Sequence, residues 1–245
     1  MNQQLKELYE TYYSELLEKK DLLPEKVSSP LFMSVFDEYE TVNKRILIVG
    51  QETNGWMEMD FDKHSVISLM EDYHSFGLGQ NRNFKEWDLA DGKKPRDYLT
   101  SPFWNFSRSF FSKINDDIDR RKKGFLWTNI SKFDVNTTTP DRKHYNLVGF
   151  ELLRKEVQIV KPDIVLFLTG VESEQKAQKP KYDEVIENAL KLHFSPVYSN
   201  QLVLKLNHED GYFPKNTFKI DHPRYLQSII KYNDVMNDLL KNIES

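Results

Sequence analysis

The chain has 245 residues, 39% of them hydrophobic, a length and composition that suit one large domain or a domain with an appendage. It contains no cysteine, which excludes disulfides, a thiol nucleophile, an iron–sulfur cluster and a cysteine-based zinc site. The formal net charge of −4 argues against indiscriminate binding of polyanions.

Residues 1–43 are predicted to form a helical extension that packs on the core. Residues 3–22 place apolar side chains at helical spacing, and the stretch that follows contains Pro24 and Pro30 and is expected to be a connector. The opening sequence MNQQLKELYE lacks the basic start and apolar core of a signal peptide. No apolar run reaches the ~20 residues of a membrane span. We therefore expect a cytoplasmic protein.

Residues 44–245 are predicted to form the main domain. Apolar runs predict strands at residues 45–49, 125–131, 164–169, 197–199, 202–206 and 217–220. Helical patterns lie at residues 63–73, 101–114, 147–160, 182–192 and 224–243. A polar segment, residues 77–97, is interpreted as an excursion or lid. This alternation predicts a three-layer α/β/α fold with a central, mainly parallel four-stranded sheet.

Polar residues follow the predicted strands. In open α/β sheets, ligands lie outside the carboxyl ends of the strands. The residues at these ends are Gln51, Glu52 and Asn54 after the first strand, Asn129, Ser131 and Lys132 at the second, Thr169 at the third and His222 after the last. We expect several of them to converge on one site. The six histidines show no HExxH or HxH spacing, so neither a metal nor a cofactor is expected.

Three short motifs lie within or after these strands, and a fourth begins the helix predicted before the second strand. They are GQE at residues 50–52, SPFWNF at 101–106, LWTN at 126–129 and HPRYL at 222–226. Together they resemble the uracil-DNA glycosylase superfamily, in order and spacing over residues 45–230. That family places Gly-Gln-Asp-Pro-Tyr after its first strand, an Asn in its second and His-Pro-Ser-Pro-Leu after its last. The resemblance implies a fold of that family and excision of a base from DNA.

The resemblance also assigns roles to individual residues. Glu52 occupies the position of the catalytic acid, and His222 that of the histidine that hydrogen-bonds the departing base. Gln51, Asn54 and Asn129 are then base-binding residues. The predicted DNA contacts are Lys132, Arg224, Tyr225 and Leu226, with Leu226 as the wedge that fills the space left by a flipped nucleotide. The candidates for an aromatic that stacks on the base are Phe61, Phe76 and Phe103.

The chain departs from the family pattern beside the catalytic acid. Glu52 is one methylene longer than the usual Asp, and Thr53-Asn54 replaces Pro-Tyr, so the tyrosine that excludes bulky 5-substituents is missing. Arg224-Tyr225 replaces Ser-Pro in the last motif. The implied substrate is uracil or a larger, modified or damaged pyrimidine. No lysine occupies a motif position as an amine nucleophile, which favours a monofunctional glycosylase.

Each of these residues also has a structural interpretation. Glu52 suits a helix cap, Asn129 a buried amide that satisfies loop backbone, and Leu226 a core position. Two further functions therefore stand beside the glycosylase hypothesis, whose partner is single- or double-stranded DNA. One is a non-catalytic protein that binds nucleic acid or a nucleotide on the same fold. The other is an unrelated α/β hydrolase that acts on a small nucleoside.

Overall fold

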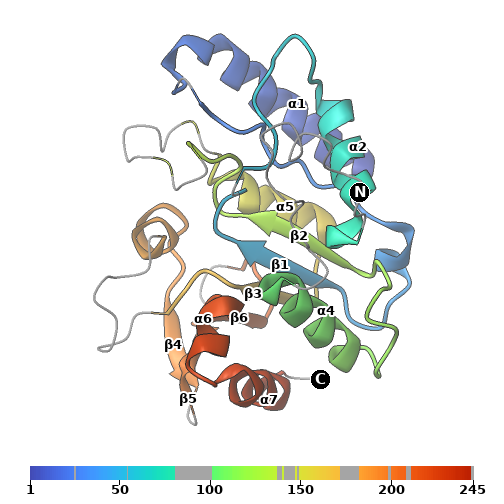
Figure 1. Cartoon of the computed structure of the whole chain (residues 1–245), viewed down its shortest axis with the longest axis vertical. Coiled ribbons are helices and arrows are strands. Elements are labelled where there is room, and N and C mark those ends of the chain that lie inside the picture. Colours follow the sequence, from blue (N-terminus) through green and yellow to red (C-terminus); the bar gives the residue numbers. More distant parts are fainter. Residues whose placement is uncertain are drawn as a thin grey trace.

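A computed structural model describes residues 1–24, 26–53, 55–80, 101–136, 140, 147, 149–171, 182–197, 200–207 and 211–243. The fold is α/β, with helices packed around one six-stranded sheet (Figure 1). The strand order is β2-β1-β3-β6-β5-β4. The strands are β1 (Ile46–Gly50), β2 (Phe125–Asn129), β3 (Ile164–Phe167), β4 (Phe194–Val197), β5 (Asn200–Leu206) and β6 (Asn216–Ile220).

The α/β class predicted from the sequence is confirmed, but the strand count of four is wrong. β2, β1, β3 and β6 are parallel neighbours, as a mainly parallel sheet requires. β4 and β5 then add an antiparallel pair to the edge formed by β6. The reason is local, because two short strands close in sequence pair with each other and extend the sheet.

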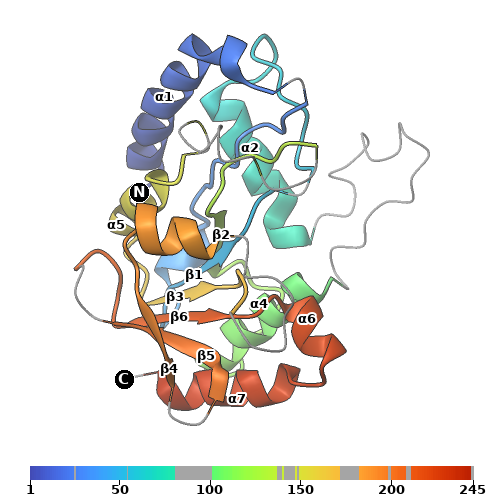
Figure 2. The ribbon, with the colours of Figure 1, turned by 90° about the vertical axis from the view of Figure 1, so that its left-hand side faces the viewer.

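The helices are α1 (Asn2–Glu18), α2 (Val66–Phe76), α4 (Pro102–Ile114), α5 (Leu152–Val160), α6 (Pro223–Ser228) and α7 (Tyr232–Asn242). Short 3-10 turns lie at Lys20–Leu22, Asp37–Glu40 and Gly77–Gly79, and a π-helical turn lies at Val185–Ala189. One face of the sheet, the α5 face, is covered by α5. The opposite face, the α4 face, is covered by α4 with α6 and α7 beside it (Figure 2).

Two predicted helices differ from the structure for backbone reasons. The helix predicted at residues 147–160 begins only at Leu152, because Gly149 has a φ of 71° that a helix does not allow. The helix predicted at 224–243 is two helices, α6 and α7, separated by Ile230 with a φ of 58°. The polar segment from residue 81 onward lies outside the described residues.

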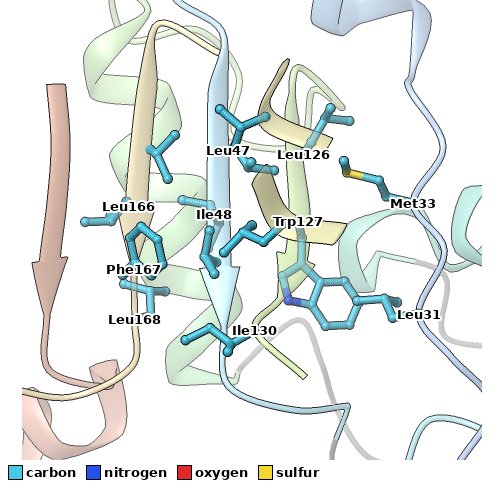
Figure 3. Packing of buried hydrophobic residues seen from close by; sticks show 14 of the residues in the cluster. Leu31, Met33, Leu47, Ile48, Leu126, Trp127, Ile130, Leu166, Phe167 and Leu168 are labelled. Atoms are coloured by element: carbon cyan, nitrogen blue, oxygen red, sulfur yellow. The ribbon is translucent and has the colours of Figure 1, made fainter. Parts of the chain in front are cut away.

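The N-terminal segment contributes to the same hydrophobic core as the sheet. Tyr9 of α1 stacks on Phe32 with ring centroids 4.4 Å apart. Leu31 and Met33 lie beside Trp127 at the outer side of β2 (Figure 3). Packing of this kind buries the apolar face of α1 against the domain. The boundary between an extension and a domain at residue 43 stays a prediction.

The outer strands of the sheet are each modified at one backbone position. In β2, the backbone N–H of Trp127 donates to the Tyr73 hydroxyl of α2 at 2.9 Å, instead of to another strand. In β4, Pro196 has no backbone N–H, and the pairing shifts register between Pro196 and Val197. Within the described ranges, no helix combines the length and apolar character needed to cross a membrane.

Candidate functional site

The ends of β1 and β2 meet at Gly50 and Asn129, which are register partners. A Cβ built on Gly50 would lie 2.3 Å from Asn129 Oδ1 and 3.3 Å from Trp127 Nε1, so a glycine is required for this approach. The side chain of Asn129 therefore lies across the end of β1. This is the carboxyl end of the parallel strands, where the sequence predicts a site.

Asn129 carries a buried hydrogen-bond donor for which the described residues provide no partner. Its Oδ1 accepts a bond from Trp127 Nε1 at 3.1 Å. Its Nδ2 is buried and has no partner among the described residues, although only 1% of Asn129 is exposed. A buried donor without a partner is costly, so such groups mark places where a ligand or water completes the bonding.

Gln51 ties the end of β1 to the end of β3. The side-chain Nε2 of Gln51 donates to the Thr169 backbone carbonyl at 2.8 Å. The backbone carbonyl of Gln51 accepts from the Ser131 N–H at 3.0 Å. Thr169 Oγ1 is buried and, within the described part of the chain, has no hydrogen-bond partner. Polar atoms that follow three neighbouring strands thus meet at the carboxyl end of the sheet, as predicted.

Glu52 begins a loop that is anchored to the end of β2. The hydroxyl of Thr53 donates to Asp134 Oδ2 at 2.5 Å, and the N–H of Gly55 donates to the same oxygen at 2.6 Å. Ser28 Oγ lies 2.8 Å from Thr53 Oγ1 and accepts from the Asp134 N–H. Glu52 itself is partly exposed at the start of this loop. The predicted base-binding Asn54 lies outside the described residues.

His222 follows β6 and caps the N-terminus of α6. Its Nδ1 accepts a bond from the Arg224 N–H at 3.2 Å, so the proton of the neutral ring lies on Nε2. Burial lowers the pKa of His222 to about 4; the Arg224 charge acts in the same direction, and Asp221 opposes it. His222 is therefore a neutral donor at physiological pH.

Phe103 connects His222 to the aromatic cluster of the α4 face. Its ring stacks on His222, with centroids 6.0 Å apart and an interplanar angle of 26°. It also contacts Trp127 edge-on at 6.4 Å. Of the three aromatic candidates from the sequence, Phe103 lies at the site, Phe76 is buried in the core, and Phe61 packs on Tyr13.

Lys132 lies in the interior, a location that does not fit the predicted DNA contact. Its side chain has 0% exposure, and its ammonium donates to Glu156 Oε2 and Thr128 Oγ1 at 2.7 Å and to the Asn129 carbonyl at 3.0 Å. Burial lowers the pKa of Lys132, and the charge of Glu156 opposes that shift. Lys132 bonds the end of β2 on the α5 face, and its buried ammonium is not accessible to a phosphate at the surface.

The predicted wedge residue is also buried. Leu226 has 0% exposure and belongs to the hydrophobic core, because the first turns of α6 press it against the domain. Its structural interpretation is therefore the one that the geometry supports. Arg224 is exposed and Tyr225 is partly exposed on the same helix, so both remain able to contact a ligand outside the site.

Sequence reasoning missed two residues that shape the site. Trp127 lies within the LWTN motif and received no role of its own, although its indole N–H bonds the Asn129 amide oxygen. Asp134 was not singled out, although its carboxylate holds the loop that carries Glu52. A signal for Asp134 was present, since an acidic residue soon after a strand end is placed to bond the N–H groups of a neighbouring loop.

Two hollows in the described part of the chain lie away from the carboxyl end of the sheet. A hollow of ≈ 340 Å³ lies between α1 and α2, and a second of ≈ 490 Å³ lies between α1 and α5. Among the described residues, no group of three or more histidines and carboxylates is placed to hold a metal ion. Comparisons with protein-family models, with curated proteins and with solved structures found no match to this chain.

Proposed function

We propose that this chain is a DNA glycosylase of the uracil-DNA glycosylase type, which binds a flipped pyrimidine at the strand ends and hydrolyses its N-glycosidic bond. One observation carries the proposal: Asn129 has a buried amide donor without a partner among the described residues, its bonding partner Trp127 contacts Phe103, and Phe103 stacks on the neutral donor His222. The motif resemblance and the parallel order β2-β1-β3-β6 support it.

This arrangement suits the chemistry of a pyrimidine base. Uracil and its derivatives carry carbonyl oxygens that accept hydrogen bonds, and a flat ring that stacks on an aromatic face. Asn129 Nδ2 and His222 Nε2–H supply donors, and the partly exposed ring of Phe103 supplies the face. A base of duplex DNA has to leave the helix before it can be held in this way, because its ring face and its hydrogen-bonding edge are inaccessible while it is stacked and paired.

The reaction assigns a separate task to each charged or polar group. The C1′–N1 bond breaks, its electron pair leaves with the base, and positive charge develops on the sugar. The carboxylate of Glu52 stabilises that charge and takes a proton from the water that adds to C1′. The N–H of His222 donates to the base carbonyl, where negative charge accumulates.

Base release from synthetic oligonucleotides tests the proposal. Single-stranded and duplex oligonucleotides carry uracil, hypoxanthine or a substituted cytosine, and alkali-labile sites are counted after incubation. We expect release by the wild type and a loss of at least about 100-fold in Glu52→Gln, as for removal of a positioned acid or base. Glu58→Gln is the matched control, because Glu58 is exposed in the same loop. Equal rates in Glu52→Gln and wild type would remove Glu52 from the mechanism.

A second candidate is a non-catalytic protein that binds a nucleotide or nucleic acid on this fold. Within this candidate, the burial of Lys132 and Leu226 favours a nucleotide as the ligand, since two of the four predicted DNA contacts are absent from the surface. The same oligonucleotides distinguish the two functions. Binding that leaves every oligonucleotide resistant to alkali supports the second candidate.

A further inference from the structure

The amide of Asn129 has two chemically different ends, and Trp127 determines which end faces the site. An indole N–H donates and cannot accept, whereas an amide offers an oxygen acceptor and an NH₂ donor. The bond from Trp127 Nε1 to Asn129 Oδ1, 3.1 Å long, therefore turns the oxygen inward. The NH₂ group is then a donor at the strand ends that has no partner in the described part of the chain.

We propose that Trp127 is a positioning residue that fixes the Asn129 amide with its donor toward the ligand, and so selects bases that carry an oxo group over bases that carry an amino group at the contacted position. This inference rests on the proposed function, because it concerns the base held at the same site. It assigns to Trp127 a role in specificity and not in the chemical step.

The backbone of β1 and β2 leaves room for the bond between Trp127 and Asn129. Trp127 and Asn129 are two residues apart in β2, so both side chains lie on the α4 face. The Cβ that Gly50 lacks would meet both partners, Oδ1 at 2.3 Å and Nε1 at 3.3 Å. Figure 3 shows the indole nitrogen of Trp127 on the side of its ring that faces β1 and Ile130. Gly50 thus provides the space in which the bond forms.

The indole ring has little freedom to turn away from Asn129. It is 6% exposed, and it packs edge-on against Trp104 at 5.1 Å and against Trp56 at 5.9 Å. Tyr73 stacks on it at 6.2 Å and accepts a bond from its backbone N–H. A donor held this rigidly cannot follow a rotated amide, so the orientation with Oδ1 inward is favoured over its alternative.

The orientation of the amide translates directly into base preference. An oxo group accepts from Nδ2 and satisfies it, whereas an amino group places a second donor against it and leaves both unpaired. Sites that hydrogen-bond a ligand group discriminate strongly against analogues that lack it. We expect the wild type to bind an oxo-bearing base at least about 100-fold more tightly than the amino-bearing analogue.

The test measures binding, so it does not depend on catalysis. Anisotropy of labelled single-stranded oligonucleotides gives the affinity for one 2′-fluoro-deoxyuridine and for one 2′-fluoro-deoxycytidine; the fluorine prevents bond cleavage by destabilising positive charge on the sugar. In Trp127→Phe the amide is free to rotate, and we expect the uridine-to-cytidine preference to fall about tenfold or more. Trp104→Phe removes another indole of the same cluster that does not bond Asn129, and should keep the wild-type preference.

A second variant isolates the N–H from the shape of the ring. Incorporation of benzothienylalanine in place of Trp127 keeps the bicyclic ring and replaces only the N–H by sulfur, and its preference should fall as in Trp127→Phe. An unchanged preference in either Trp127 variant, an equal fall in Trp104→Phe, or equal wild-type affinity for both bases would overturn the inference. Preserved discrimination without any release of uracil contradicts the proposed glycosylase activity alone.

Discussion

Thr128 and Asn129 are adjacent in β2, and their side chains lie on opposite faces of the sheet. On the α5 face, Thr128 Oγ1 bonds to both Glu156 and Lys132, and the second oxygen of Glu156 accepts from Tyr9 at 2.8 Å. On the α4 face, Asn129 keeps a buried donor without a described partner. One strand thus carries a closed polar network on one side and an incomplete one on the other.

The difference offers a criterion other than residue type for telling structural polar groups from candidate binding groups. A lysine and a glutamate attract attention in a sequence, yet here they satisfy each other in the interior. The amide and the imidazole are less conspicuous, yet they retain bonding capacity at the strand ends. Burial with complete bonding predicts a role in stability, and burial with incomplete bonding predicts a role in binding.

Breaking the closed network should have the largest effect on stability. Lys132→Met removes the ammonium and leaves the Glu156 carboxylate buried without its counter-charge. We expect the free energy of unfolding to fall by about 3–5 kcal/mol, measured by urea denaturation. The double variant Lys132→Met, Glu156→Leu should recover much of the loss, because no unpaired charge remains. A loss below about 1 kcal/mol in the single variant would mean that the network contributes little.

Protonation of His222 should have the next largest effect on the free energy of unfolding. His222 is the second donor proposed for the α4 face, so the measurement extends the comparison to it. The folded pKa is about 4 and the unfolded value about 6.5, so the unfolded state binds more protons between these pH values. Stability should therefore fall by about 2–3 kcal/mol as pH drops from 6.5 to 4, and should be constant with respect to this group above pH 6.5.

The variant His222→Gln isolates that contribution from the other titrating groups. The difference in unfolding free energy between wild type and variant, measured by denaturation at a series of pH values, should change over the window from pH 6.5 to 4. A difference that is independent of pH would show that the imidazole is as easily protonated in the folded protein as in the unfolded one.

Truncation of Asn129 should have the smallest effect on stability and a large effect on binding. Asn129→Ala removes one neutral hydrogen bond with Trp127 and also removes the buried Nδ2, for which no described residue is a partner. We expect a loss of only about 1 kcal/mol in unfolding free energy. Affinity for the fluorinated uridine oligonucleotide should fall at least about tenfold. A stability loss as large as that of Lys132→Met would remove the contrast between the two faces.

The sequence was informative where a local pattern decides the structure. Unbroken apolar runs predicted β1 and β3, and the polar residues that follow them predicted the carboxyl end of the sheet, where Gln51 bonds the Thr169 carbonyl. Pro102 at the start of α4 was likewise a local signal. These features depend on neighbours in the chain, which a sequence displays.

The burial of Lys132 depends instead on a partner in another element. Lysine is rarely buried, and only the docking of α5 places Glu156 against it. The Trp127–Asn129 bond similarly requires the register of β2 against β1, which puts a glycine opposite the amide. The break between α6 and α7 at Ile230 involves neither glycine nor proline, so it carries no local signal.

The two outer strands also affect how molecules of this protein meet each other. A sheet grows from one molecule into the next when an edge presents a regular row of backbone donors and acceptors. Here Tyr73 occupies the Trp127 N–H of β2, and Pro196 of β4 has no N–H to offer. At both described edges the row is interrupted, and an interrupted row disfavours the growth of the sheet by strand addition.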